Sequence, residues 1–209
     1  MKKNLQKIIE IMRETYKSPK CELEWTTPFE LLVAVILSAQ CTDKRVNMVV
    51  AKLFKEYNKP EQFANISQEE LEDWIKPCGF YHNKARNIIS ASRDIVERYN
   101  GEVPSDKDSL MQLSGVGEKT ASVVQAVAYN VPAIAVDTHV LRLSNRFGFV
   151  NNQKDPHKVM IALQRAVPKE YWIDFHYAMV LHGRYVCKAQ KPNCGSCCFK
   201  EYCRSCKIK

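Results

Sequence analysis

The strongest constraint on the fold of this chain is a stretch that is apolar on every side. Leu31 to Leu37 is the longest uninterrupted apolar run, and Thr27-Pro-Phe-Glu30 before it has the form of a capping box with proline at the first helical position. The run is too short to cross a bilayer. A helix that is apolar around its whole circumference needs partners on all sides. The sequence therefore predicts a buried central helix over residues 31–39.

The rest of the chain shows apolar residues at helical spacing, interrupted by capping residues and turns. Asp43 and Ser105 are predicted to cap two of these helices, and Asp137 a third. The short apolar stretch over residues 133–136 is interpreted as a link between helices, because no second strand-like run exists to pair with it. The predicted fold class is all-α.

Charge is unevenly distributed. The formal net charge is +8, and from Arg184 to the end there are seven Lys and Arg residues against one acid. This basic excess predicts a polyanion partner, although a merely solubilising tail would look the same. No charged segment followed by an apolar one opens the chain, so we expect a cytoplasmic protein that does not contact a membrane.

Six of the nine cysteines lie between Cys187 and Cys206. Without an export signal, such clustering indicates metal binding rather than disulfides. Two Cys-x2-Cys pairs, Cys194 with Cys197 and Cys203 with Cys206, are typical of structural zinc sites, although the five residues between the pairs are fewer than usual. Cys187 with Cys194, Cys197 and Cys203 is instead a compact four-thiolate set of the kind that iron–sulfur clusters use. Spacing alone leaves both partitions open.

Two closely spaced glycines predict a tight turn between two helices. Gly115-Val116-Gly117 allows a tight turn that exposes backbone N–H groups, and a helical pattern starts directly after it. A helix N-terminus with bare amides binds phosphate. Lys119 lies in the first turn, where the helix dipole favours the neutral, nucleophilic amine. The alternatives are a turn without a ligand and a solvated lysine.

Four motifs together resemble the endonuclease III family of bifunctional DNA glycosylases, within the helix-hairpin-helix superfamily. They are His182-Gly-Arg-Tyr-Val-Cys187, the cysteine spacing, Leu113-Ser-Gly-Val-Gly-Glu-Lys119 and Ile134-Ala-Val-Asp-Thr-His139. The resemblance runs from the N-terminal helix to Cys203. It implies a six-helix barrel domain over residues 21–133 and a helical iron–sulfur domain made of residues 1–20 and 134–209. It also implies a [4Fe–4S] cluster on Cys187, Cys194, Cys197 and Cys203 rather than zinc.

The resemblance further assigns roles. Lys119 would be the nucleophile and Asp137 a catalytic carboxylate, while the Gly115-Val116-Gly117 amides would hold a phosphate. Without the family, Asp137 is an ordinary helix cap. The remaining DNA contacts implied are Gln40, Phe80, His139, Lys188 and Lys191. Phe80 departs from the family, which usually has leucine there.

The implied activity is removal of oxidised pyrimidines from double-stranded DNA, followed by cleavage at the abasic site through a lysine Schiff base. We expect a monomer in a prokaryotic cytoplasm, associated with the nucleoid. Two alternatives remain. An adenine-type mismatch glycosylase of the same superfamily generally lacks a lysine at the position of Lys119, and a non-catalytic DNA-binding iron–sulfur protein would use the hairpin only as a phosphate clamp.

Overall fold

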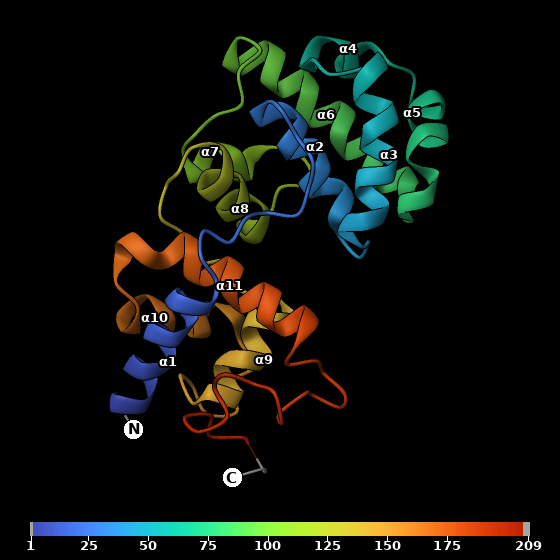
Figure 1. The fold of residues 1–209 in the computed structure, drawn as a ribbon. Coiled ribbons are helices and arrows are strands. Elements are labelled where there is room, and N and C mark those ends of the chain that lie inside the picture. The colour runs from blue at the N-terminus through green and yellow to red at the C-terminus, as the bar shows by residue number, and fades with distance from the viewer. Residues whose placement is uncertain (1, 207–209) are drawn as a thin grey trace. The chain divides into compact units, whose positions relative to one another are not determined.

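The computed structural model describes residues 2–206, and over this range the chain consists of helices joined by loops, with no β-strand (Figure 1). This confirms the all-α prediction. Residues 133–136 belong to neither a helix nor a strand, as expected for an inter-helix link. Among the helices of residues 2–206, none is long and apolar enough to span a membrane.

The chain divides into two compact units. The stretch up to Cys21 joins the chain from Pro132 onward to form one of them, here called the terminal unit, and Glu22–Val131 forms the other, the central unit. The outer ends of the predicted iron–sulfur domain, residues 1 and 207–209, lie outside the described residues. The units are described separately below.

The central unit is built around its first helix, α2. Its helices are α2 (Pro28–Ser38), α3 (Asp43–Glu56), α4 (Pro60–Asn65), α5 (Gln68–Ile75), the 3-10 turn η1 (Lys76–Cys78), α6 (Tyr81–Tyr99), α7 (Lys107–Gln112) and α8 (Glu118–Ala128). Every residue of α2 from Phe29 to Leu37 is buried, and α2 contacts α3, α6 and α8. The predicted central buried helix is therefore confirmed.

Two predicted caps are wrong by one residue. Thr42, not Asp43, caps α3, and Asp106, not Ser105, caps α7. Asp106 Oδ1 accepts a hydrogen bond of 2.8 Å from the N–H of Ser109. In both cases two neighbouring polar residues could have served, and the extended backbone of the capping residue decides where the helix begins.

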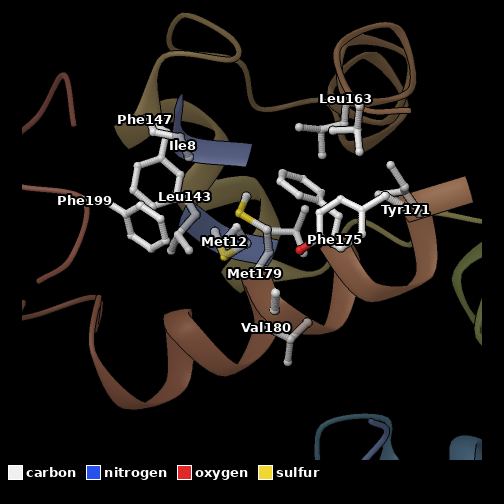
Figure 2. Close-up of a cluster of buried hydrophobic side chains, with 14 of the residues drawn as sticks. Ile8, Met12, Leu143, Phe147, Leu163, Tyr171, Phe175, Met179, Val180 and Phe199 are labelled. Carbon is white, nitrogen blue, oxygen red and sulfur yellow. The ribbon is translucent and has the colours of Figure 1, made fainter. Parts of the chain in front are cut away.

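The terminal unit contains α1 (Lys2–Thr15), α9 (Thr138–Phe147), α10 (Pro156–Ala166), the 3-10 turn η2 (Lys169–Tyr171) and α11 (Trp172–Tyr185). Helix α11 contacts both α1 and α9. The core contains side chains from every one of these helices and from residues 187–206, here called the cysteine-rich segment (Figure 2). Among them are Ile8, Met12, Leu143, Phe147, Leu163, Phe175, Met179 and Phe199. The N-terminal helix is thus held by residues from the C-terminal third of the chain.

Tyr171 is a buried side chain of this core with an unsatisfied polar atom. It is 4% exposed, and among the described residues its hydroxyl has no hydrogen-bond partner. The guanidinium of Arg13 lies over its ring, 5.5 Å from the centroid. Burial raises the pKa of Tyr171 to about 12.

Tyr171→Phe should keep the ring contact and remove the unsatisfied hydroxyl. We expect the free energy of unfolding at neutral pH to be unchanged or to rise by about 1 kcal/mol. Folding raises the pKa of Tyr171 from about 10 to about 12. The contribution of this group to the free energy of unfolding is therefore fully present below pH 10 and is lost as the pH rises from 10 toward 12. The variant should therefore lose less stability over that range than the wild type in urea unfolding. A large destabilisation at neutral pH would mean that the hydroxyl is satisfied.

Candidate functional site

The hairpin between α7 and α8 has the tight geometry that its glycines predict. Gly115 adopts a left-handed backbone with φ of 79°, and the N–H of Val116 donates to the Leu113 carbonyl at 3.1 Å. A Cβ on Gly115 would come within 2.9 Å of the Asn87 Cβ on α6. Both the dihedral angle and this close approach require glycine. The side chain of Val116 is buried, so the turn is anchored in the central unit.

Helix α8 begins directly after this turn. Its N-cap is Gly117, which has no side chain to cap the first N–H groups of the helix. Glu118 pairs with Lys107 of α7 at 2.8 Å, and Lys119 in the first turn is exposed. Backbone amides and the positive end of the helix dipole point the same way, which is the arrangement that binds a phosphate.

Asp137 precedes the first residue of helix α9, in the terminal unit. Asp137 Oδ1 accepts a hydrogen bond of 2.8 Å from the N–H of Val140, so the predicted capping role is confirmed. His139, in the first turn, is half-buried, and its Nδ1 lies 3.1 Å from the guanidinium of Arg142. A Cβ on Gly183 of α11 would come within 2.7 Å of the His139 Cβ. Glycine at this position lets the two helices approach closely.

Two arginines of α9, one turn apart, hold the start of the cysteine-rich segment. Arg142 donates to the carbonyls of Gly183 at 2.9 Å and Cys187 at 3.1 Å. Arg146 donates to the carbonyls of Lys188 at 2.8 Å and of the next residue at 2.9 Å. Burial lowers the pKa of Arg142. Sequence reasoning missed both residues, because charged side chains at helical spacing normally belong to a solvated face.

The four predicted cluster ligands lie in one region of the terminal unit. Cys187 lies two residues beyond the end of α11 and interacts electrostatically with Cys194, Cys197 and Cys203. Its sulfur lies 3.2 Å from the Arg146 guanidinium. Among the described residues, no three His, Cys, Asp or Glu side chains are placed to hold a single metal ion. Four thiolates surrounding a wider body are the donor set of an iron–sulfur cluster, so the residue types fit that group.

Two neighbours of the cysteines matter for this fit. Cys206 is buried and its thiol hydrogen-bonds with Cys194, so the structure brings a fifth cysteine to the same place. His182 is buried; its Nδ1 lies 2.8 Å from the Tyr16 hydroxyl and its Nε2 lies 3.6 Å from the Cys197 sulfur. Burial lowers the pKa of His182 to about 4, so the ring is neutral and joins α1 to the cysteine-rich segment.

The two predicted lysine contacts lie in the loop between the first two cysteines. Lys188 and Lys191 are exposed, and Lys191 has a left-handed backbone with φ of 47°. The N–H of Asn193 donates to the Val186 carbonyl at 3.1 Å and closes the loop. The backbone of this loop is therefore fixed at both ends, while its lysine side chains face solvent.

Gln40 and Phe80 lie in the central unit, and both have left-handed backbones, with φ of 53° and 49°. Gln40 is exposed, and Phe80 is 63% exposed. A third residue, missed by sequence reasoning, connects their two loops. Lys84 is 5% exposed, and its Nζ donates at 2.9 Å to the carbonyls of Leu37 and Cys78. A signal was present, because Lys84 lies one turn before the apolar residue Ile88 on the buried face of α6.

Comparison with known proteins identifies the family. Residues 33–169 match the HhH-GPD superfamily of base excision DNA repair proteins. The chain is 47% identical to endonuclease III of Bacillus subtilis, over 97% of this chain and 92% of the relative. It is 45% identical to endonuclease III of Escherichia coli, over 94% of this chain and 92% of the relative. The chain belongs to the endonuclease III family.

Solved structures agree with this assignment. An endonuclease III in a non-covalent DNA complex superposes with a TM-score of 0.95 at 46% identity, over 99% of this chain and 97% of that chain. A trapped endonuclease III–DNA covalent intermediate gives the same score and coverage at 47% identity. The predicted helix-hairpin-helix glycosylase fold is confirmed, and so is the class of enzyme. As an endonuclease III, the chain is a base excision repair DNA glycosylase with AP lyase activity.

The capping role of Asp137 can be separated experimentally from a role in chemistry. Asp137→Asn keeps an oxygen that can cap α9, whereas Asp137→Ala should lower the free energy of unfolding by about 1 kcal/mol. Asp155→Ala is a matched control, because Asp155 caps α10 in the same unit and accepts from the N–H of His157 at 2.9 Å. It should lose similar stability and keep its activity. Equal stability of wild type and Asp137→Ala in urea unfolding would contradict the capping role.

Proposed function

We propose that this endonuclease III removes oxidised pyrimidines from double-stranded DNA, with Lys119 as the nucleophile. The observation that carries the proposal is the placement of an exposed lysine in the first turn of α8, directly after the Gly115–Gly117 turn. A covalent intermediate with DNA has been trapped for a similar protein, and such an intermediate requires a nucleophilic side chain. The amine of Lys119 is such a nucleophile, and the neighbouring turn offers backbone amides that can hold a DNA phosphate close to it.

The reaction begins with the damaged nucleotide turned out of the duplex, because its C1′ is inaccessible within the base stack. The amides around Gly117 bind a backbone phosphate nearby. The neutral amine of Lys119 attacks C1′, and the bond between C1′ and the base breaks. Asp137 stabilises the positive charge that develops on the sugar. The base leaves with a proton. The C1′–O4′ bond then breaks and O4′ takes up a proton, which opens the sugar and leaves a Schiff base between C1′ and Lys119. This imine loses a proton from C2′, and the 3′ phosphate leaves by β-elimination.

The remaining contacts position the DNA. Lys188 and Lys191 contact backbone phosphates from their exposed loop, and His139 lies near the backbone. Gln40 and Phe80 fill the space that the extruded nucleotide leaves. Phe80 is bulkier than the leucine usual in the family, and its exposed ring suits insertion between bases.

A [4Fe–4S] cluster held by Cys187, Cys194, Cys197 and Cys203 completes the proposed enzyme. When bound, the cluster cross-links the segment that follows α11 and so contributes to its folding. Arg142 and Arg146 hold the backbone at the first ligand, and the loop with Lys188 lies between the first and second ligands. The proposed cluster therefore bears on the shape of a DNA-contacting loop.

The substrate is duplex DNA that contains damaged pyrimidines or abasic sites, and the protein acts as a monomer in a prokaryotic cytoplasm, at the nucleoid. Lys119 argues against the adenine-type mismatch glycosylase, which generally lacks it. The non-catalytic alternative predicts duplex binding without strand cleavage. Strand cleavage of an abasic-site duplex distinguishes the proposed lyase from both alternatives.

An amine that attacks C1′ passes through an imine, which borohydride reduces to a stable secondary amine. Wild-type protein should therefore become covalently attached to abasic or thymine-glycol duplexes, whereas Lys119→Gln should not. Lys119→Gln should still bind the duplex, since phosphate contacts supply most of the affinity. Lys107→Gln is the matched control, because Lys107 lies on the same hairpin and pairs with Glu118. Trapping of the Lys119→Gln protein would show that another amine is the nucleophile.

The ligand set predicts which cysteines the cluster needs. The purified protein should be brown and contain roughly four irons per chain. Cys194→Ser should lose the colour and iron, whereas Cys198→Ser and Cys206→Ser should keep both. Cys206 is the sharper control, because its thiol hydrogen-bonds with Cys194. A colourless protein with one zinc, or loss of iron in Cys206→Ser, would overturn the assignment.

A further inference from the structure

The last turn of α2 ends in a network of hydrogen bonds in which one donor comes from far along the chain. The final four carbonyls of a helix lack intrahelical partners. Here each accepts from a different donor: Val35 from the Ser38 hydroxyl at 2.8 Å, Ile36 from the Ala39 N–H at 3.4 Å, Leu37 from Lys84 Nζ at 2.9 Å and Ser38 from the Cys41 N–H at 3.1 Å. Three of these donors lie within three residues of their acceptors, whereas the donor to the Leu37 carbonyl, Lys84, lies 47 positions away.

The same ammonium also reaches the turn before α6. Lys84 Nζ donates at 2.9 Å to the carbonyl of Cys78, the last residue of η1. Gly79 and Phe80 follow, both with left-handed backbones, at φ of 67° and 49°. The lysine therefore ties together two loops that are distant in sequence. One contact lies three residues before Gln40, and the other lies two residues before Phe80.

The two loops carry strain that needs support. A left-handed backbone is unfavourable for Gln and Phe, which lack the local hydrogen bonding of Asn or Asp. Phe80 in addition exposes an aromatic ring to solvent. Such a conformation persists when the surroundings fix it. A buried cation that donates to the carbonyls on both sides supplies this restraint.

The charge of Lys84 suits this place. A cation is favourable at a helix C-terminus, here that of α2. Cys41 and Cys78 lie close enough to interact with it electrostatically, but burial raises the pKa of the Cys78 thiol to about 11, so that group is uncharged at neutral pH. The two carbonyls are therefore the hydrogen-bond acceptors that compensate for burial of the ammonium.

We propose that Lys84 is a positioning residue for lesion recognition, which holds Gln40 and Phe80 as a preformed pair ready to enter the space left by an extruded nucleotide. The inference rests on the proposed function. Loops fixed in the bound conformation lose little entropy on binding, so their rigidity increases affinity for lesion DNA. Contacts to undamaged duplex, made mainly by phosphates, do not depend on it.

The test compares binding to two duplexes of one sequence, one undamaged and one with a tetrahydrofuran abasic analogue. Lys84→Met keeps the length of the side chain and removes both hydrogen bonds. It should weaken binding to the analogue by about tenfold and change binding to undamaged duplex by less than about twofold. 2-Aminopurine opposite the analogue should show a fluorescence change with wild type that is reduced with Lys84→Met, because ring insertion changes base stacking.

A double-mutant cycle separates positioning from general stability. If Lys84 acts through the Phe80 loop, Lys84→Met should weaken binding less in a Phe80→Ala protein than in wild type, because only the part of its effect that acts through Gln40 remains. A merely structural role predicts the same loss in both backgrounds and would overturn the proposal. Ile88→Val is the control for stability, because it shortens a buried side chain one turn along α6 and should leave the ratio of the two affinities unchanged.

Two further variants keep the test decisive if Lys84→Met folds poorly. Lys84→Arg retains charge and donors and should preserve more selectivity than Lys84→Gln, which retains one donating group. Equal loss in both would contradict the proposal. If wild type itself shows no preference for the analogue and no borohydride trapping, the proposed function fails. If wild type prefers the analogue, and Phe80→Ala but not Lys84→Met reduces the preference, only the inference about Lys84 fails.

Discussion

Helix ends leave backbone groups without partners, and in this chain of short helices the proposed functional residues gather at those ends. The hairpin at Gly115 leads into α8, Asp137 caps α9 and Cys187 follows α11. Where a side chain caps the end, the helix start is fixed and the capping residue is held in one place. Where glycine stands at the cap, the amides remain available to a phosphate. The difference between Gly117 and Asp137 is thus a difference in what each helix end binds.

Long basic side chains close the opposite ends. Lys84 donates to the end of α2, and Arg142 donates to Gly183 in the last turn of α11. Each cation reaches across from a neighbouring helix and meets carbonyls at the negative end of a helix dipole. Arg146 extends the pattern into the loop after Cys187. The same interaction therefore fixes loops in both units, although the loops have different proposed tasks.

Local features could be predicted from the sequence, and long-range ones could not. The burial of α2 follows from its apolar circumference, and the cap at Asp137 and the turn at Gly115 follow from residues within a few positions. The caps at Asp43 and Ser105 failed because adjacent polar residues competed. The hydrogen bond from Lys84 to the Leu37 carbonyl could not be predicted, because the two residues lie 47 positions apart and only tertiary packing brings them together. The roles of Lys119 and Asp137 came from resemblance to a family, because first-turn geometry alone does not distinguish a nucleophile from a solvated lysine.

The terminal unit is made of two segments separated in sequence, and this constrains the order in which the chain can fold during synthesis. The ribosome makes α1 before the central unit, yet other members of the core that contains Ile8 and Met12, such as Phe175 and Phe199, are made after it. The whole central unit, with its own buried helix, is translated in between and has the contacts to fold on emergence. During this interval the apolar face of α1 stays open to water and to chaperones. Helix α1 thus completes its packing only after the central unit and residues 187–206 have been translated.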